Sequence, residues 1–250
     1  VSLEPVRTIQ AYGRQAMNEW TEAPAISLGA VDQEAVRLAV PREITVTLTA
    51  HGAELRRFTC SPGNESGLVA GHLLTMGFIK RRSGLVRLDV TGGPDRLVDA
   101  VLHPPERPVA SQPRPQSAVS LAAVGPGVLH RAADITYSWG ELYNLTRGAH
   151  AAALFDETGT MVEMAEDIGR YNAVDKVVGA RLLRRGSVDC LLLVVTCRVS
   201  LEMVEKVVRA GVPLVLTKAA PTDRALAAAA ELGLTIVHRD AQRRLYAFSR

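Results

Sequence analysis

The chain has only three cysteines among its 250 residues, and no two of them form a C-x-x-C pair. A small, odd number of cysteines argues against a disulfide scaffold and fits a reducing compartment, so we expect a cytoplasmic protein. Because C-x-x-C is missing, thioredoxin-like redox chemistry and the common zinc sites lose their main support, and we expect no metal site.

The sequence also lacks features that are typical of several other protein classes. No apolar run reaches the roughly 18 residues that a membrane helix needs, and no secretory signal opens the chain. There is no G-x-G-x-x-G, Walker or G-x-S-x-G motif, and no H-x-E with P-C-x-x-C. The net charge of +3 is too small to indicate nucleic-acid binding. The first residue, Val1, is not a methionine, which leaves open whether sequence precedes it in the native protein.

With 47% hydrophobic and 22% charged residues, the chain can bury a core, and its length fits one large domain or two modest ones. Residues 1–40 have no sustained hydrophobic period, and we expect an N-terminal extension with a short helix or a surface arm at 6–20. Alternating apolar and polar residues from Ile44 predict a strand, and we expect a small, β-rich α+β domain over 41–102. Its expected elements are strands at 44–48, 55–60 and 86–90 and a helix at 68–77 that Asn64 can cap.

Five prolines lie among polar residues between positions 103 and 117. Because proline fixes the backbone and removes a hydrogen-bond donor, we predict a linker or irregular loop over 103–132. The C-terminal domain, 133–250, alternates strands and helices, which implies an α/β fold with a parallel sheet and right-handed crossovers. Its expected elements are a helix at 134–145, a hairpin of strands at 151–155 and 161–164, helices at 173–184, 201–208 and 223–232, and strands at 191–196, 214–217 and 234–237.

Residues 166–176 pack three acids, two bases, an asparagine and a glycine into eleven positions where an apolar helix begins. Backbone N–H groups left free at a helix start, next to Arg170 and Lys176, suit an anionic ligand such as a phosphate. The alternative is a capped helix start that faces solvent, and the spacing alone favours this alternative.

Two loops follow the carboxyl ends of predicted parallel strands, at residues 197–200 and 218–222. Each carries one base and one hydroxyl and leads into a helix, and ligands bind beyond such strand ends in open sheets. The pair of loops can hold a diphosphate or a nucleotide, although Ser200 and Thr222 are also ordinary helix caps. Arginines that follow the last predicted strand can reach the same edge of the sheet.

His150 lies between a glycine turn and three alanines, so a ligand can approach its ring closely. A hydrogen-bonded core histidine is an equally good interpretation. Two cysteines are candidates for a reactive thiol: Cys197 ends a strand beside Arg198, where a thiolate would be stabilised, and Cys60 precedes a turn. For both cysteines, filling of the core is the alternative.

Four segments, in this order along the chain, resemble the FdhD/NarQ family, the formate dehydrogenase accessory sulfurtransferases. The resemblance covers residues 44–79 and 146–246. The matching segments are 60–79 with the family's T-P-G-D and the helix after it, 146–153 with T-G-G-x-H-A-A-A, 166–176 with E-D-x-G-R-H-N-A-V-D-K, and 196–202 with S-G-R-x-S-x-E.

The resemblance implies a C-terminal three-layer cytidine-deaminase-like α/β domain with a smaller β-rich α+β N-terminal domain. It also implies that the protein takes sulfur from a cysteine desulfurase and passes it to the molybdenum bis(molybdopterin guanine dinucleotide) cofactor, which is bound rather than used, before that cofactor enters formate dehydrogenase. A guanine nucleotide would serve as a surrogate ligand. Whether the protein forms a homodimer is left open. The resemblance and the loops together assign these residues to the cofactor: Gly148, His150, Asp167, Gly169, Arg170, Asn172, Asp175, Lys176, Arg198, Ser200, Lys218, Thr222, His238, Arg239 and Arg243.

The family carries its sulfur on a C-G-x-C loop ahead of the T-G-G-x-H segment, and here the corresponding interval has no cysteine. Arg147 replaces a family glycine, and Tyr171 replaces the histidine of G-R-H-N. Two hypotheses follow, and they leave open whether the chain is an enzyme. In one, a sulfurtransferase has moved its thiol to Cys197 or Cys60; in the other, a non-catalytic protein binds or chaperones the molybdenum cofactor. A third interpretation is a deaminase-fold domain that binds another nucleotide.

Overall fold

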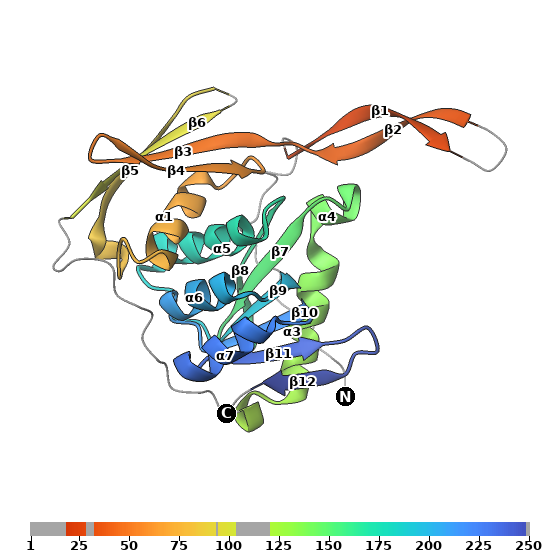
Figure 1. The fold of residues 1–250 in the computed structure, drawn as a ribbon, viewed down its shortest axis with the longest axis vertical. Coiled ribbons are helices and arrows are strands. Elements are labelled where there is room, and N and C mark those ends of the chain that lie inside the picture. Colours follow the sequence, from red (N-terminus) through yellow and green to blue (C-terminus); the bar gives the residue numbers. More distant parts are fainter. Residues whose placement is uncertain (1–18, 29–32, 94, 104–120, 249–250) are drawn as a thin grey trace.

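The computed structural model describes residues 19–28, 33–93, 95–103 and 121–248. Its strands form a two-stranded ribbon, a four-stranded sheet and a six-stranded sheet. The four-stranded sheet lies at one end of the molecule, the ribbon extends sideways from it, and the six-stranded sheet with its helices forms the larger body (Figure 1). No helix in the described part of the chain has the length and apolar character needed to cross a membrane.

The sequence indicated no strands in the predicted N-terminal extension, residues 1–40, and the structure shows a two-stranded ribbon there. β1 (Trp20–Leu28) and β2 (Gln33–Pro41) pair antiparallel along their whole length and form a projecting arm (Figure 1). The arm leaves no hydrophobic period in the sequence because water reaches both of its faces. Ile26 and Leu38, for example, keep 63% and 54% of their surface exposed. Nearly all of the short helix considered at 6–20 lies outside the described residues.

The small sheet has the order β4-β3-β6-β5, in which β3 and β6 run parallel and the other pairs antiparallel. Its hairpin and its helix are confirmed, whereas β6 was not predicted. Asn64 occupies the N-cap position of α1, but its side chain makes no capping bond and donates instead to the carbonyl of Lys176. The elements are β3 (Ile44–Ala50), β4 (Ala53–Cys60), α1 (Glu65–Thr75), the 3₁₀ turn η2 (Arg82–Gly84), β5 (Leu85–Thr91) and β6 (Arg96–Leu102).

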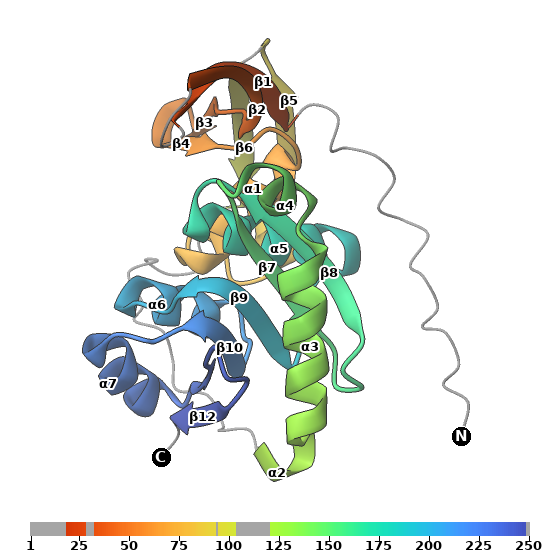
Figure 2. The ribbon, with the colours of Figure 1, turned by 90° about the vertical axis from the view of Figure 1, so that its right-hand side faces the viewer.

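The large sheet has the order β12-β11-β10-β9-β7-β8 and confirms the predicted α/β fold. β9, β10 and β11 run parallel and are joined through α6 and α7, as the alternation of elements predicts. α5, α6 and α7 cover one face of the sheet and α3 the other (Figure 2). The elements are α2 (Leu121–Val124), α3 (Pro126–Trp139), α4 (Glu141–Thr146), β7 (His150–Phe155), β8 (Met161–Asp167), α5 (Arg170–Arg185), β9 (Leu192–Arg198), α6 (Leu201–Arg209), β10 (Leu214–Ala219), α7 (Asp223–Leu232), β11 (Thr235–Arg239) and β12 (Leu245–Phe248).

The predicted irregular segment 103–132 is wrong for its last part, since α3 starts at Pro126. Proline is favoured in the first turn of a helix, where its missing N–H has no intrahelical partner in any case. Most of the proline-rich stretch itself, residues 104–120, lies outside the described residues.

The small sheet is joined to the large body through α1, which packs on α5 with the two backbones in contact. A Cβ atom at Gly71 would lie 1.9 Å from the carbonyl oxygen of Asp175, and one at Gly179 would lie 1.9 Å from that of Gly67. Only glycine permits so close an approach. One apolar core therefore runs from the small sheet and α1 through α5 to α6 and α7.

Glu19 lies at the base of the arm, and the raised pKa of its carboxyl predicts that stability depends on pH. Burial, reinforced by the charges of Glu166 and Glu141 but opposed by Lys176, raises the pKa of its carboxyl from 4.5 to about 7. The folded state thus binds the proton more tightly than the unfolded state, so stability falls as the pH rises from about 4.5 through 7. Glu19→Gln is expected to melt a few degrees above the wild type at pH 8 and at the same temperature near pH 4.5. Melting curves across this range test the assignment, and a constant difference between the two proteins would contradict it.

Candidate functional site

The strand ends named in the sequence meet at one edge of the large sheet. β7 runs antiparallel to β9, so the first residue of β7 lies at the edge where β9, β10 and β11 end. The pairing places His150 opposite Asp167, Arg198 opposite Ala219, and Thr217 opposite His238. The predicted convergence of these strand ends is confirmed.

A cavity of about 630 Å³ opens at this edge, between the sheet and the α3–α4 segment. Its volume lies within the range of small-molecule sites. Its walls are Thr136, Tyr137, Gly140 and Tyr143 from the helices, Arg147, Gly148, Ala149, His150 and Ala151 from the chain that enters β7, and Thr196, Lys218 and Ala219 from β9 and β10.

The cavity exists because the strands separate at this edge. The pairing of β7 with β9 ends at Ala152 and Val195, and the next backbone N–H, that of Ala151, donates to the hydroxyl of Thr196 at 2.9 Å. On the other side, the register of β10 shifts at Lys218. Such a bulge turns a side chain out of the regular alternation of a strand. Lys218 is exposed, and its Nζ lies 5.5 Å from the ring centre of Tyr137.

The helical wall depends on a break at Gly140, where the single helix predicted at 134–145 divides into α3 and α4. The carboxylate of Glu166 accepts the backbone N–H groups of Leu142 and Tyr143, each at 2.9 Å, and so caps α4. A Cβ atom at position 140 would lie 2.5 Å from this carboxylate, which explains the glycine. The break places one tyrosine from each helix in the cavity wall.

Two cations in the wall have no acidic partner. Within the described residues, neither Arg147 nor Lys218 has a carboxylate within ion-pair distance. Each instead lies over a tyrosine ring, Arg147 over Tyr143 with its Cζ 5.1 Å from the ring centre and Lys218 over Tyr137. The hydroxyl of Tyr137 is buried and has no hydrogen-bond partner in the described part of the chain. Positive charge, aromatic surface and a free donor together suit a phosphorylated ligand with a planar base.

His150 contributes a neutral ring to this wall. Burial, and next the charge of Arg170, lower the pKa of its imidazole, so the ring is uncharged at neutral pH. It can therefore donate or accept one hydrogen bond with a ligand but adds no positive charge.

Of the other predicted residues, several lie at the same edge but outside the cavity wall. Gly169 and Arg170 begin α5, and Arg198 ends β9. The hydroxyl of Thr222 accepts the N–H of Ala225 at 3.2 Å, which confirms helix capping, the alternative considered for this residue. Ser200 and Asn172 are also engaged within the protein: Ser200 bonds the hydroxyl of Tyr171 at 2.8 Å, and Asn172 donates to the carbonyl of Thr59 at 2.8 Å.

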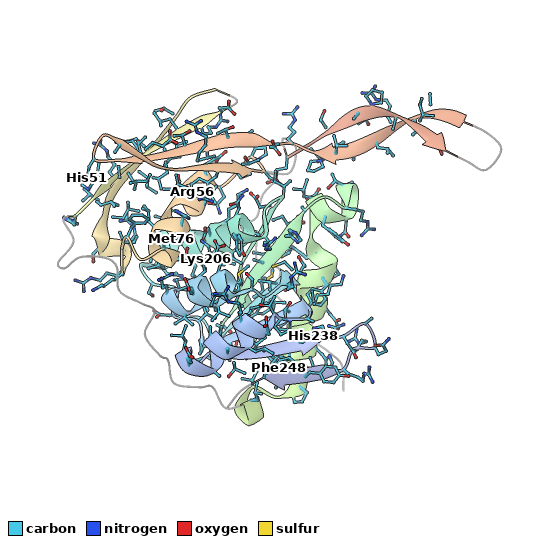
Figure 3. The ribbon with its side chains drawn as sticks, in the orientation of Figure 1. His51, Arg56, Met76, Lys206, His238 and Phe248 are labelled. Atoms are coloured by element: carbon cyan, nitrogen blue, oxygen red, sulfur yellow. The ribbon has the colours of Figure 1, made fainter. Side chains whose placement is uncertain are left out.

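Three charged residues predicted to contact the cofactor are buried in the protein interior, which corrects the prediction for them. Lys176 pairs with Asp167 at 2.7 Å and donates to the carbonyl of Ser61 at 2.8 Å. Asp175 accepts from Lys206, whose Nζ lies 2.8 Å from the carboxylate. Lys206 lies in the interior beside the end of α1, where Met76 is labelled (Figure 3). A ligand in solvent reaches none of these groups.

The C-terminal residues also differ from expectation. Arg239 and Arg243 both bind the carboxylate of Asp134 on α3, at 2.8 and 2.9 Å. Hydrogen bonds from Arg243 and Arg239 hold the pKa of Asp134 below its ordinary value, although burial opposes them. His238, labelled on β11 in Figure 3, stacks with Tyr246 at 6.2 Å between ring centres. The segment thus ties the last strands to α3 through Asp134, and Arg239 also lies over the ring of Tyr137, with its Cζ 5.5 Å from the ring centre.

All three cysteines are buried. Burial raises the pKa of Cys60 to about 12 and that of Cys197 to about 11; Arg170 and Arg198 lower the latter but do not outweigh burial. Burial likewise raises the pKa of Cys190 to about 11. The structure therefore contradicts the placement of a relocated, reactive thiol at Cys60 or Cys197. In the described part of the chain, no group of three or more His, Cys, Asp or Glu side chains is arranged to hold a metal ion.

The sequence predictions included Gly148, His150 and Lys218 of the cavity wall and missed Tyr137, Tyr143 and Thr196. The two tyrosines follow the apolar pattern of a helix, so nothing in their spacing separates a ligand contact from core packing. One signal was present. Gly140 interrupts the helical pattern between them, and a glycine inside a predicted helix often marks a break.

Comparison with known proteins relates this chain to one family. The model of the FdhD/NarQ family matches residues 106–250, more than half of the chain. The sulfur carrier protein FdhD of Mycolicibacterium paratuberculosis is 30% identical over 262 aligned residues, which cover 92% of this chain and 93% of that protein. That of Nocardia farcinica is 32% identical over 238 residues, which cover 82% of each.

Other similarities are more local or concern the fold alone. The FdhD of Thermoplasma volcanium is 41% identical over 114 residues, 46% of this chain and 41% of that protein, and for several such relatives the matched part is less than half of their own length. A crystal structure of a protein assigned as a formate dehydrogenase accessory protein from Desulfotalea psychrophila aligns with a TM-score of 0.80 and 21% identity. The alignment covers 93% of this chain and 98% of that one, which supports the same two-part α/β fold.

Proposed function

The chain belongs to the FdhD/NarQ family, and we propose that it is a formate dehydrogenase accessory protein that binds the molybdenum bis(molybdopterin guanine dinucleotide) cofactor. The observation that carries the proposal is the cavity at the sheet edge, where two cations that have no acidic partner among the described residues lie over two tyrosine rings. The name shared by the relatives, sulfur carrier protein FdhD, and the description of the structural neighbour support the role in formate dehydrogenase maturation.

The residues of the cavity fit one phosphorylated guanosine part of that cofactor. Arg147 and Lys218, which lie over the rings of Tyr143 and Tyr137, offer charge to phosphate oxygens, and the two tyrosines add aromatic surface to the wall of a site for a planar base. The cofactor supplies the molybdenum chemistry when it is delivered; the residues of this chain hold the nucleotide and partly exclude water from it.

Of the two hypotheses on sulfur, the cavity and the cysteines together favour the non-catalytic one. Transfer through Cys60 or Cys197 requires an accessible thiolate, and both thiols are buried and held protonated. Under this proposal the partner is formate dehydrogenase, which receives the cofactor from the accessory protein. A cysteine desulfurase is a direct partner only under the sulfur-transfer alternative.

Calorimetric titration with guanosine diphosphate tests the proposal. The wild type is expected to bind, and Lys218→Ala is expected to bind roughly tenfold or more weakly, because a charge-assisted hydrogen bond to phosphate contributes about 1.5–3 kcal/mol. The control is Arg198→Ala, which removes a positive charge from the same sheet edge but outside the cavity wall. Equal losses of affinity in the two variants would mean that the ligand binds along the sheet edge rather than in the cavity. No binding by the wild type would refute the proposal.

A further inference from the structure

Arg147 adopts a backbone conformation that favours glycine. Its φ of 56° lies in the left-handed region, at the residue that ends α4, and its N–H donates to the carbonyl of Tyr143 at 2.7 Å. Helices often end in this way, and glycine is the usual residue because a Cβ atom is disfavoured there. Glycine at position 147 would perform the same backbone role with less strain. A strained residue at the wall of a cavity points to a use for its side chain.

The side chain of Arg147 is placed for such a use. It is exposed, lines the cavity and lies over the ring of Tyr143. No carboxylate among the described residues neutralises it. This contrasts with Arg239 and Arg243, which both pair with the carboxylate of Asp134. The guanidinium is thus held by an aromatic face that leaves its N–H groups free to bind an anion.

The second cation of the cavity comes from the opposite wall. Lys218 belongs to the sheet and lies over Tyr137 on α3, whereas Arg147 follows α4 and lies over Tyr143. Cations on two separate walls suit two phosphate groups better than one. An ammonium group binds phosphate as a point charge, while a guanidinium can donate to two oxygens of one phosphate group.

We propose that Arg147 is a specificity-determining residue that binds the outer phosphate of the nucleotide and selects a nucleoside diphosphate over a monophosphate. This inference rests on the proposed function, since it concerns the same cavity. A purely structural role, as a helix end or as a partner for the Tyr143 ring, makes a different prediction. Loss of the side chain would then lower stability and leave ligand selection unchanged.

The test compares the wild type with Arg147→Gly and Arg147→Lys in titrations with guanosine diphosphate, guanosine monophosphate and guanosine. Arg147→Gly is expected to weaken binding of the diphosphate about tenfold, that of the monophosphate about twofold or less, and that of guanosine not at all. Arg147→Lys keeps the positive charge but lacks the paired N–H donors of the guanidinium, and its affinity for the diphosphate is expected to be intermediate. Because glycine suits the backbone, the melting temperature of Arg147→Gly without ligand is expected to equal or exceed that of the wild type.

The outcomes separate this inference from the proposed function. If the wild type binds the diphosphate and Arg147→Gly binds it equally well, the inference is overturned and the proposed function stands. An equal loss for all three ligands, or a clear fall in the melting temperature, also overturns it, because both indicate a structural role. If the wild type binds none of the three ligands, the proposed function and the inference fail together.

Discussion

Replacement of Asp175 by alanine is expected to lower the free energy of unfolding by about 3–5 kcal/mol, because it leaves the Lys206 ammonium buried without its counter-ion. Both side chains are 2% exposed, and the carboxylate also accepts the hydroxyl of Thr75 at 2.7 Å. Burial raises the pKa of Asp175, but the charges and hydrogen bonds of Lys206 and His72 together outweigh burial and lower the pKa, so the carboxyl remains ionised in the folded state. Urea denaturation of the two proteins measures the loss.

A double variant separates the unpaired charge from other effects of the substitution. Asp175→Leu combined with Lys206→Met removes both charges while keeping similar volume, and it is expected to recover most of the loss. Asp223→Ala, at the exposed start of α7, is the matched control and is expected to cost no more than about 1 kcal/mol. A loss below about 1 kcal/mol for Asp175→Ala would mean that the carboxylate is open to solvent, and Asp175 would again be a candidate for ligand binding.

The parts of the fold that the sequence predicted well are those in which local pattern and final environment agree. The run at 191–196 is continuously apolar because helices cover both faces of β9. α5 and α7 end at Gly186 and Gly233, which adopt the left-handed conformation expected of glycine at these positions. Each of these elements keeps the same type in the structure as in the prediction because its own residues contain the required signals.

The strands that were missed are formed by pairing with a neighbouring strand and show little pattern of their own. β6 contributes Val98 and Ala100 to the core, but its remaining residues are partly exposed and its partner β3 lies about fifty positions earlier. The arm has no hydrophobic period because neither of its faces is covered. In both cases a strand forms through pairing, which a single-sequence pattern does not record.

The candidate site shows the same limit at the level of single residues. The edge of the sheet followed from the order of strands and helices, so His150 and Lys218 could be predicted. Which charged side chains are buried could not be predicted. Lys176 and Asp175 stand next to each other in a charged segment, and only the packing of α1 against α5 buries them. A run of charges therefore identified the correct helix start but not which of its charges face solvent.

The native protein is expected to resist alkylation at all three cysteines. A rise in pKa from 9.0 to about 12 at Cys60 and to about 11 at Cys190 and Cys197 lowers the thiolate fraction about 1000-fold and 100-fold, and burial also blocks the reagent. Mass spectrometry after brief treatment with iodoacetamide at pH 8 should show no adduct in buffer and three adducts in urea. The Lys80→Cys variant, which places a thiol on the exposed segment after α1, should gain one adduct in buffer and so control for reagent activity.

Incubation with a cysteine desulfurase and cysteine tests whether these buried thiols accept sulfur. A persulfide forms when a thiolate attacks the outer sulfur of a persulfide on the desulfurase and displaces the desulfurase cysteine as a thiolate. A thiol that iodoacetamide cannot reach should not accept sulfur from so much larger a donor. The intact mass should therefore stay unchanged. A gain of one sulfur that disappears in Cys197→Ser or Cys60→Ser would instead show that the protein opens at that strand end. In that case the chain would be a sulfurtransferase with a relocated thiol, and binding of the nucleotide in the cavity would be one step of its reaction rather than its whole function.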